Sequence, residues 1–346
     1  MENRTVVAVD LAKSVFEIAV SQTPGEVSRT ERLPRSKFLA FFETLPPCVV
    51  VMEACGSATY WGRRIQALGH QVALLPPHQV RPYVTRNKTD RTDAKGILEA
   101  YRNKDILPVP IKAVEQQVIG SLHGFRSGWI SARTAQVNTL RGLLRKFGVT
   151  IPVGIKKVLP SVRLLIEDAD SAIPDPLRPV VALACDEIET LTQKIKHSER
   201  ELETLAQAIP QIMRILTIPG VGMIVATAFF AFVGDVTRFP SGRHLASYLG
   251  LTPRERSSGG RRRLGAISKR GDAYMRLLLV HGARSLLFHA ARAKSHDPLR
   301  EWAMKLRGRT KHNKAAVAVA NKLARLLWAV SRHERPYEAT PVAVAA

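Results

Sequence analysis

Apolar positions recur with two different periods along the first hundred residues. Phe16, Ile18 and Val20 stand at every second position, which is the period of a half-buried strand, whereas residues 38–45 repeat at helical spacing. The pattern predicts strands at residues 5–9, 15–20, 27–33, 48–52 and 71–75, and helices at 38–45, 60–68 and 90–102. Three strands followed by alternating helices and strands predict an α/β domain with a mixed sheet.

Helical spacing dominates the rest of the chain. Residues 114–147 form one predicted helix that stops at Gly148, and the prolines between 152 and 179 indicate a connector. Further helices are expected at 223–233, 245–249, 274–288 and 315–330, and the tail after Pro336 is expected to be loose. We therefore divide the chain into a first domain at 1–149, a connector with a helical segment at 150–212, a mainly helical domain at 213–335 and a tail at 336–346.

A heptad pattern runs through the helical segment between the two predicted domains. Its a and d positions are Val181, Ala184, Ile188, Leu191, Ile195, Ser198, Leu202 and Leu205. Only the serine interrupts this apolar stripe, and the outer face is rich in Glu and Lys. The pattern supports a coiled coil, within one chain or between chains. An ordinary amphipathic helix packed on its own domain explains it about equally well, because the run is only about three to four heptads long.

Positive charge is concentrated in the last third of the chain. The sequence has 52 Lys and Arg against 29 Asp and Glu, a formal net charge of +23. Residues 213–346 hold 24 basic and 7 acidic side chains, whereas residues 1–105 hold 15 and 11 and residues 106–212 hold 13 and 11. A folded region this basic is expected to bind a polyanion, and nucleic acid is the usual one. A merely solubilising surface would need net charge but not a cluster of one sign.

Several protein classes are disfavoured by the composition. The three cysteines form no CxxC pair, which argues against a disulfide scaffold or a cysteine zinc site and fits a reducing cytoplasm. The amino terminus leads into one short apolar run, unlike a signal peptide. The longest apolar stretch, near residues 224–233, is too short to span a bilayer. We expect a cytoplasmic protein without a membrane partner.

Four carboxylates occupy positions where an α/β frame brings side chains together. Asp10 ends the first predicted strand and Glu53 the fourth. Asp90 and Asp93 open a helix and share one face of it, because three residues separate them. Converging carboxylates repel one another, and a hard divalent cation, Mg²⁺ or Mn²⁺, relieves the repulsion and supports phosphodiester chemistry. Taken singly, Asp90 also suits a helix cap and Glu53 a solvated strand end.

A basic, glycine-rich loop lies between residues 251 and 276. Ser257 and Ser258 precede a glycine pair whose backbone can approach a phosphate closely. The predicted nucleic-acid-binding residues of the loop are Arg254, Arg256, Arg261, Arg262, Arg263, Lys269 and Arg270. A serine hydroxyl in this setting is a candidate nucleophile, because guanidinium groups stabilise a pentavalent phosphorane. The alternative is a flexible phosphate contact that performs no chemical step.

Short motifs along nearly the whole chain resemble one known family. In the first domain they are Asp10-Leu11-Ala12-Lys13, Glu53-Ala54-Cys55-Gly56 and Asp90-Arg91-Thr92-Asp93. In the last third they include Pro219-Gly220-Val221-Gly222, Tyr248-Leu249-Gly250, Ser257-Ser258-Gly259-Gly260, Ser268-Lys269-Arg270-Gly271 and Asn321-Lys322-Leu323-Ala324-Arg325. In order and spacing the set resembles the DEDD insertion-sequence transposases, the insertion-sequence family numbered one hundred and ten.

This resemblance implies a fold, a chemistry and partners. The first domain is expected to be RNase H-like and related to Holliday-junction resolvases, with the four carboxylates holding Mg²⁺. Ser258, immediately before the glycine pair, is expected to form a covalent phosphoserine link to DNA, with Ser257 as the neighbouring candidate. The family implies a structured guide RNA that pairs with donor and target DNA. It also implies homodimers that pair into tetramers, with composite sites that take carboxylates from one protomer and serine from another.

Three functions follow as competing hypotheses. The leading one is a Mg²⁺-dependent DNA recombinase of an insertion sequence that uses Ser258 as its nucleophile. The second is a metal-dependent, structure-specific nuclease or junction resolvase, in which Ser258 only contacts phosphate. The third is a non-catalytic basic protein that binds nucleic acid. A covalent protein–DNA intermediate distinguishes the first hypothesis from the second.

Overall fold

The chain packs as two compact units. The computed structural model describes residues 5–23, 26–84, 90–290, 292 and 297–339. The first unit comprises Met1–Ala113 and the second Val114–Ala346. These are units of packing, and the functional division predicted at residues 149 and 212 stays a prediction.

A mixed sheet forms the centre of the first unit, as the alternating pattern predicted. Its described strands are β1 (Val6–Leu11), β2 (Val15–Ser21), β3 (Arg29–Pro34), β4 (Val49–Glu53) and β5 (Gln71–Leu75), in the order β3-β2-β1-β4-β5. The pairs β1–β4 and β4–β5 are parallel, and the pairs β1–β2 and β2–β3 are antiparallel. The helices of the unit are α1 (Phe38–Glu43), α2 (Ala58–Ala67), α3 (Pro77–Val80) and α4 (Asp90–Arg102), with short 3₁₀ turns at Arg35–Lys37 and Arg81–Tyr83.

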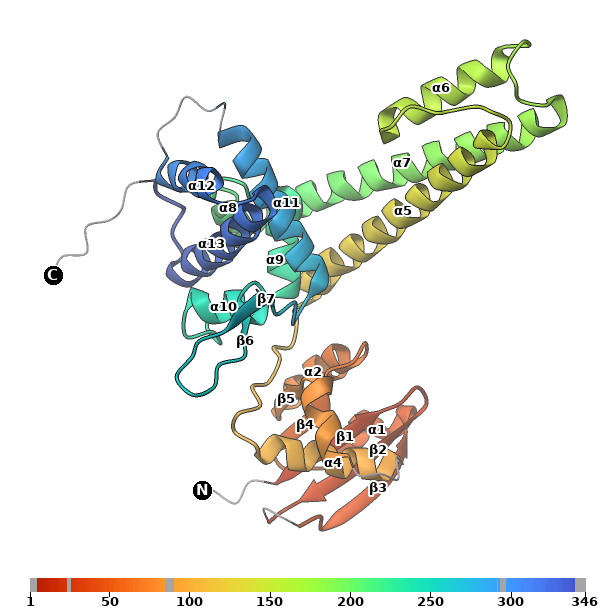
Figure 1. Ribbon diagram of the computed structural model, residues 1–346. Coiled ribbons are helices and arrows are strands. Elements are labelled where there is room, and N and C mark those ends of the chain that lie inside the picture. Colours follow the sequence, from red (N-terminus) through yellow and green to blue (C-terminus); the bar gives the residue numbers. More distant parts are fainter. Residues whose placement is uncertain (1–4, 24–25, 85–89, 291, 293–296, 340–346) are drawn as a thin grey trace. The chain divides into compact units, whose positions relative to one another are not determined.

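Strand alternation gives the sheet two differently covered faces. Val9 and Ile18 face α1 and α2 and belong to one buried cluster with Phe38 and Trp61. Residues of the other parity, such as Ala8, pack in a second cluster with the buried apolar residues of α4. Figure 1 shows α4 lying beside β1 and β2, and the two strands contact it. Side chains alternate between the two faces of a sheet along each strand. A polar residue two positions after a member of this second cluster therefore lies on the face that α4 covers.

The second unit is mainly helical, as predicted. Its described helices are α5 (Val114–Arg145), α6 (Ile155–Glu167), α7 (Arg178–Gln207), α8 (Pro210–Ile215), α9 (Met223–Phe232), α10 (Gly242–Tyr248), α11 (Ala273–Ala290), α12 (Pro298–Arg309) and α13 (His312–His333), with a 3₁₀ turn at Asp175–Leu177. A two-stranded hairpin, β6 (Pro253–Glu255) and β7 (Leu264–Ile267), stands between α10 and α11. Ile119, Phe229, Leu279 and Leu323 belong to the common core of the unit.

The heptad residues of α7 are largely buried inside this chain. Helices α5 and α7 lie side by side (Figure 1), and Val181 and Ile188 share a buried cluster with Leu140 and Leu144 of α5. The buried hydroxyl of Ser198 donates a hydrogen bond of 2.7 Å to the carbonyl oxygen of Ile195. The interrupting serine is therefore satisfied by its own helix. A coiled coil between chains stays a prediction.

The predicted connector at 152–179 contains a helix, which the proline count concealed. Helix α6 includes Pro160 in its interior. Proline removes one helical hydrogen bond, but Val158 and Val162 are fully buried against the apolar face of α5 and α7. Burial of these two side chains outweighs the local cost.

A buried histidine ties α5 to the helical core. The Nε2 atom of His123 lies 2.9 Å from the Thr227 hydroxyl oxygen, and its Nδ1 atom lies 3.0 Å from the Tyr274 hydroxyl oxygen. The Thr227 hydroxyl donates its own hydrogen to the carbonyl oxygen of Met223, so it accepts from Nε2 and leaves Nδ1 as acceptor from tyrosine. Burial, and secondarily the charge of Arg126, lower the pKa of His123 to about 4.

This histidine predicts an acid-sensitive stability. The unfolded chain binds a proton at His123 near its ordinary pKa of 6.5, whereas the folded chain resists protonation down to about 4. The free energy of unfolding should therefore fall by about 3 kcal/mol as pH drops from 6.5 to 4. Urea unfolding of the wild type and of His123→Gln, measured at several pH values across this range, tests the prediction. The variant should lose that part of the pH dependence, and equal pH slopes in both proteins would contradict the prediction.

Candidate functional site

Two of the predicted carboxylates lie at neighbouring strand ends. In the parallel pair β1–β4, Val9 pairs with Met52, and Asp10 and Glu53 are the next residues on each strand. They have the parity of Ala8 and Val51, which pack in the cluster covered by α4. Asp10 and Glu53 are both half-buried. The structure therefore brings these two carboxylates to one edge and one face of the sheet, as the sequence predicted.

The other two carboxylates belong to the start of α4. The helix begins at Asp90, whose side chain lies outside the described residues. Asp93 lies four residues before Ile97, which is fully buried in the cluster between α4 and the sheet, so the two residues share one face of the helix. The Oδ1 atom of Asp93 is buried and accepts no hydrogen bond from the residues that the structure describes.

These residues have the chemistry of a divalent-cation site. A buried carboxylate oxygen without a donor is costly in a protein interior, and a hard cation satisfies it. Within the described part of the chain, no three His, Cys, Asp or Glu side chains gather closely enough to hold a metal ion. The carboxylate of Asp90 is not among these described side chains. Asp10, Glu53 and the orphaned Asp93 oxygen therefore offer the kind of oxygen ligand that a divalent ion prefers, but these three do not form a metal site by themselves.

A fifth carboxylate, which the sequence patterns did not single out, lies on the same face. Glu17 stands opposite Asp10 in the β1–β2 ladder and therefore has the same parity. Its carboxylate lies 3.2 Å from Nε of Arg32 on β3. The alternation of apolar residues along β2 would have been enough to predict that Glu17 lies on this face. The ion pair with Arg32 offsets its charge.

The candidate serines occupy the tip of an exposed hairpin. Strands β6 and β7 are antiparallel, and Ser258 and Arg261 form an isolated bridge beyond them. Gly259 and Gly260 both have left-handed φ angles, +56° and +72°. Two consecutive left-handed residues make the tight turn that matches strand twist, and glycine adopts this conformation without steric cost. The predicted loop is thus an ordered turn with a serine at its first position.

The two serines differ in their hydrogen bonds. The Ser257 hydroxyl donates to Oε1 of Glu255 at 2.7 Å and accepts from the backbone N–H of Arg263 at 3.2 Å, so it joins the two sides of the hairpin. The hydroxyl of Ser258 makes no hydrogen bond with any residue that the structure describes, and the residue is exposed. This difference favours Ser258 as the residue that meets a ligand.

Exposed cations lie along the hairpin from its base to its tip. All seven predicted nucleic-acid contacts are exposed: Arg254, Arg256, Arg261, Arg262, Arg263, Lys269 and Arg270. Among them, Nε of Arg262 lies 3.4 Å from the Glu255 carboxylate. Exposed guanidinium groups on a ribbon suit the phosphate backbone of a nucleic acid, because each can donate two parallel hydrogen bonds.

The base of the hairpin requires glycine at residue 271. Its φ angle is +72°, and a Cβ atom there would overlap the carbonyl oxygen of Tyr248.

We predict that Gly271→Ala destabilises the second unit by about 2 kcal/mol or more, because the left-handed backbone penalty and the steric overlap add. Gly259→Ala is the matched control, since its Cβ would meet nothing within 4 Å and only the backbone penalty applies. Urea unfolding measures both, and equal losses would contradict the steric account.

None of the helices in the described residues is both long and apolar enough to cross a membrane.

Comparisons with known proteins cover both units. A family model for the DEDD transposases of IS110, described as "Transposase", matches residues 7–148. A second model, described as "Transposase IS116/IS110/IS902 family", matches residues 213–297. The first match contains the four carboxylates, and the second contains the serine hairpin.

Full-length relatives carry related names. The chain is 40% identical over 336 residues to a protein of Pseudomonas aeruginosa named "Probable family 20 transposase", covering 97% of this chain and 99% of the relative. It is 36% identical to the "Transposase for insertion sequence element IS1111A" of Coxiella burnetii, covering 97% and 92%. It is 34% identical to the "Transposase for insertion sequence element IS1328" of Yersinia enterocolitica, covering 96% and 98%.

Proposed function

The chain belongs to the IS116/IS110/IS902 family of insertion-sequence transposases, and from this premise we propose that it cleaves and exchanges DNA strands through a serine–DNA phosphodiester intermediate. The observation that carries the proposal is the exposed hydroxyl of Ser258 at a tight turn, with cations around it and no hydrogen bond to a described residue. A nucleophile must be reachable by the substrate, and a phosphoryl centre under attack needs positive charge nearby.

The proposed step is a transesterification. The Ser258 oxygen forms a bond to the scissile phosphorus, and the bond from phosphorus to the deoxyribose oxygen breaks. The serine proton leaves to solvent, and the departing deoxyribose oxygen is protonated. Arginines of the hairpin, such as Arg261, donate hydrogen bonds to the non-bridging oxygens as negative charge develops. Reversal with a different DNA hydroxyl rejoins the strand, so no external energy source is needed.

We assign the four carboxylates Asp10, Glu53, Asp90 and Asp93 as ligands of Mg²⁺, with Mn²⁺ as substitute. Support comes from the shared strand edge, the first turns of α4 and the orphaned oxygen of Asp93. When bound, the divalent ion would supply Lewis-acid stabilisation of phosphodiester oxygens. Family membership and the mixed sheet both support an RNase H-like fold for this unit.

The partners are proposed from the family. A structured RNA of the element would pair with donor and target DNA, so that base pairing reads the sequence while the protein reads backbone and shape. The protein would act on nucleoid DNA in the cytoplasm as homodimers that pair into tetramers. The long helices α5 and α7 would serve this assembly.

A junction resolvase is the second candidate, because the carboxylates alone suffice for metal-dependent hydrolysis. The two candidates differ in one product. The enzyme is incubated with end-labelled DNA and Mg²⁺, quenched in denaturant and resolved on a denaturing gel. A labelled band at the mass of protein plus DNA supports the serine intermediate, whereas cleaved DNA with no such band supports the resolvase.

A further inference from the structure

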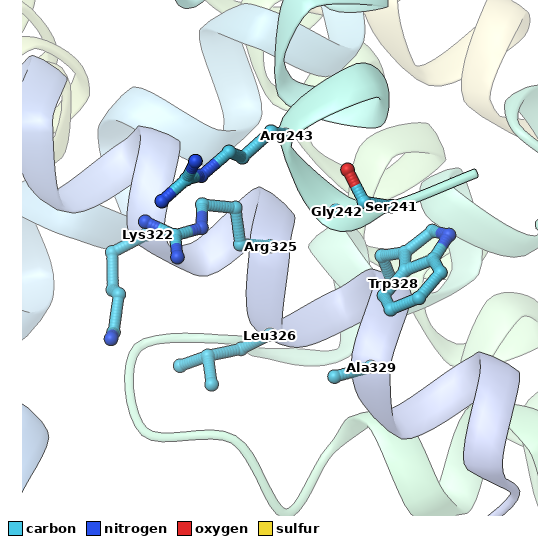
Figure 2. A pocket seen from close by; sticks show the side chains of 8 residues that line it. All are labelled: Ser241, Gly242, Arg243, Lys322, Arg325, Leu326, Trp328 and Ala329. Atoms are coloured by element: carbon cyan, nitrogen blue, oxygen red, sulfur yellow. The ribbon is translucent and has the colours of Figure 1, made fainter. Parts of the chain in front are cut away.

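A cavity of about 460 Å³ lies between the start of α10 and the second half of α13. It is separate in sequence from the serine hairpin, and Figure 2 shows the side chains that line it. Arg243 comes from α10, and Lys322 and Arg325 come from α13. The other lining residues are Ser241, Gly242, Leu326, Trp328 and Ala329. The lining thus contains three cations and no carboxylate.

Close backbone packing forms the wall of this cavity. A Cβ atom on Gly242 would lie 2.9 Å from Cα of Arg325, so the first residue of α10 rests directly on α13. Two hydrogen bonds hold the flanks of α10: Trp328 Nε1 donates to the Phe239 carbonyl at 3.0 Å, and Asn321 Nδ2 donates to the Leu251 carbonyl at 3.2 Å. The indole N–H of Trp328 is therefore occupied by the Phe239 carbonyl, and the groups left to bind a ligand are the three cations.

The three cations have no counter-charge among the residues that the structure describes. Lys322 and Arg325 are half-buried and lie one turn apart on α13, and Figure 2 shows Arg243 and Arg325 extending toward one another. None of the three forms an ion pair among the residues that the structure describes; the Lys322 ammonium lies 5.9 Å from the ring of Trp302. Arg243 is exposed at the mouth of this cavity. Like charges held close together repel, most strongly where they are partly buried, and an anion relieves that repulsion.

We propose that this cavity binds a backbone phosphate of nucleic acid, at a second site distinct from the serine hairpin. Guanidinium groups on two walls match the oxygens of a phosphodiester, and the volume accommodates a phosphate with its neighbouring sugar. The choice of nucleic acid as the anion rests on the proposed function. A DNA strand and a structured RNA present the same phosphodiester, so the experiment separates them.

The test measures affinity and its salt dependence by fluorescence anisotropy. The full-length protein is titrated into a labelled DNA duplex and, separately, a labelled RNA stem-loop. Arg325→Gln and Arg243→Gln should each weaken binding to at least one of them about tenfold at moderate salt. On duplex DNA each should also reduce the log–log salt slope by about 0.9, because one phosphate contact is lost. Arg325→Lys keeps the charge and should retain most of the slope.

Lys314→Gln is the control, since Lys314 is an exposed cation of α13 outside the cavity. It removes the same charge and should change binding much less than Arg325→Gln. Circular dichroism and thermal unfolding check that each variant is folded. A loss confined to RNA assigns the cavity to RNA, and a loss confined to DNA assigns it to DNA. Unchanged affinity and slope for both, in folded Arg325→Gln and Arg243→Gln proteins, would overturn the proposal.

The serine chemistry fails or holds independently of this result. If the wild-type protein forms no covalent adduct but the cavity variants still lose affinity and salt slope, the cavity proposal stands and the nucleophile assignment falls. If the adduct forms and the cavity variants bind normally, the nucleophile assignment stands and the cavity proposal is wrong.

Discussion

Ser258→Ala should abolish the covalent protein–DNA product while leaving DNA binding nearly unchanged. The substitution removes the attacking oxygen, and strand exchange should fall by at least about 10³-fold, as it does when an enzyme loses its nucleophile. The cations of the hairpin remain, so affinity and its salt dependence should stay close to those of the wild type. A denaturing gel measures the adduct, and anisotropy measures binding.

Ser257→Ala is the matched control for this result. Ser257 holds Glu255 and the backbone of Arg263, so its loss should loosen the hairpin and lower activity moderately without eliminating the adduct. The opposite pattern, with an adduct in Ser258→Ala and none in Ser257→Ala, would transfer the nucleophile to Ser257. Cleavage at the wild-type rate in both variants would favour the resolvase.

Asp10→Asn should reduce strand cleavage by at least about 100-fold. Loss of a partner that only orients a metal ligand costs about 10- to 100-fold, and loss of a ligand should cost at least as much. Asp10 stands beside Glu53 at the strand edge covered by α4, so Glu53→Gln should have a similar effect. Glu43→Gln is the control. The substitution removes the same charge, but Glu43 is exposed at the end of α1, away from Asp10 and Glu53.

A second measurement separates metal binding from activity. A ligand that binds only the folded state raises the unfolding temperature. Mg²⁺ or Mn²⁺ should therefore raise the unfolding temperature of the wild type and of Glu43→Gln, and raise that of Asp10→Asn much less. An equal rise in all three proteins, or cleavage by Asp10→Asn at the wild-type rate, would place the metal site elsewhere.

Local patterns in the sequence determined much of this architecture. The two-residue period of Phe16, Ile18 and Val20 and the helical spacing elsewhere predicted the mixed sheet and the helical second unit. Both signals depend on neighbouring residues, which lie together whatever the rest of the chain does. The placement of Asp10 and Glu53 at strand ends predicted that they would meet at one sheet edge, and the structure adds that their strands are parallel neighbours.

Other features depended on packing between distant segments. The prolines of 152–179 concealed α6, because burial of Val158 and Val162 overcame a local penalty. The heptad stripe was recognised, but only the structure shows it packed against α5 of the same chain. Ser257 and Ser258 are adjacent and chemically identical, and the partner across the hairpin distinguishes them.

The sequence alone thus determined the family, the strands and helices, and the residue types able to act on a phosphodiester. The tertiary structure decided which serine hydroxyl is held by hydrogen bonds within the hairpin, which carboxylate oxygen is left without a donor, and which cations face one another. Arg243 and Arg325 are 82 positions apart in the sequence and meet only where Gly242 lets α10 rest on α13. Charge and hydrogen-bonding capacity belong to each residue, whereas their effect depends on distances that only the packed chain sets.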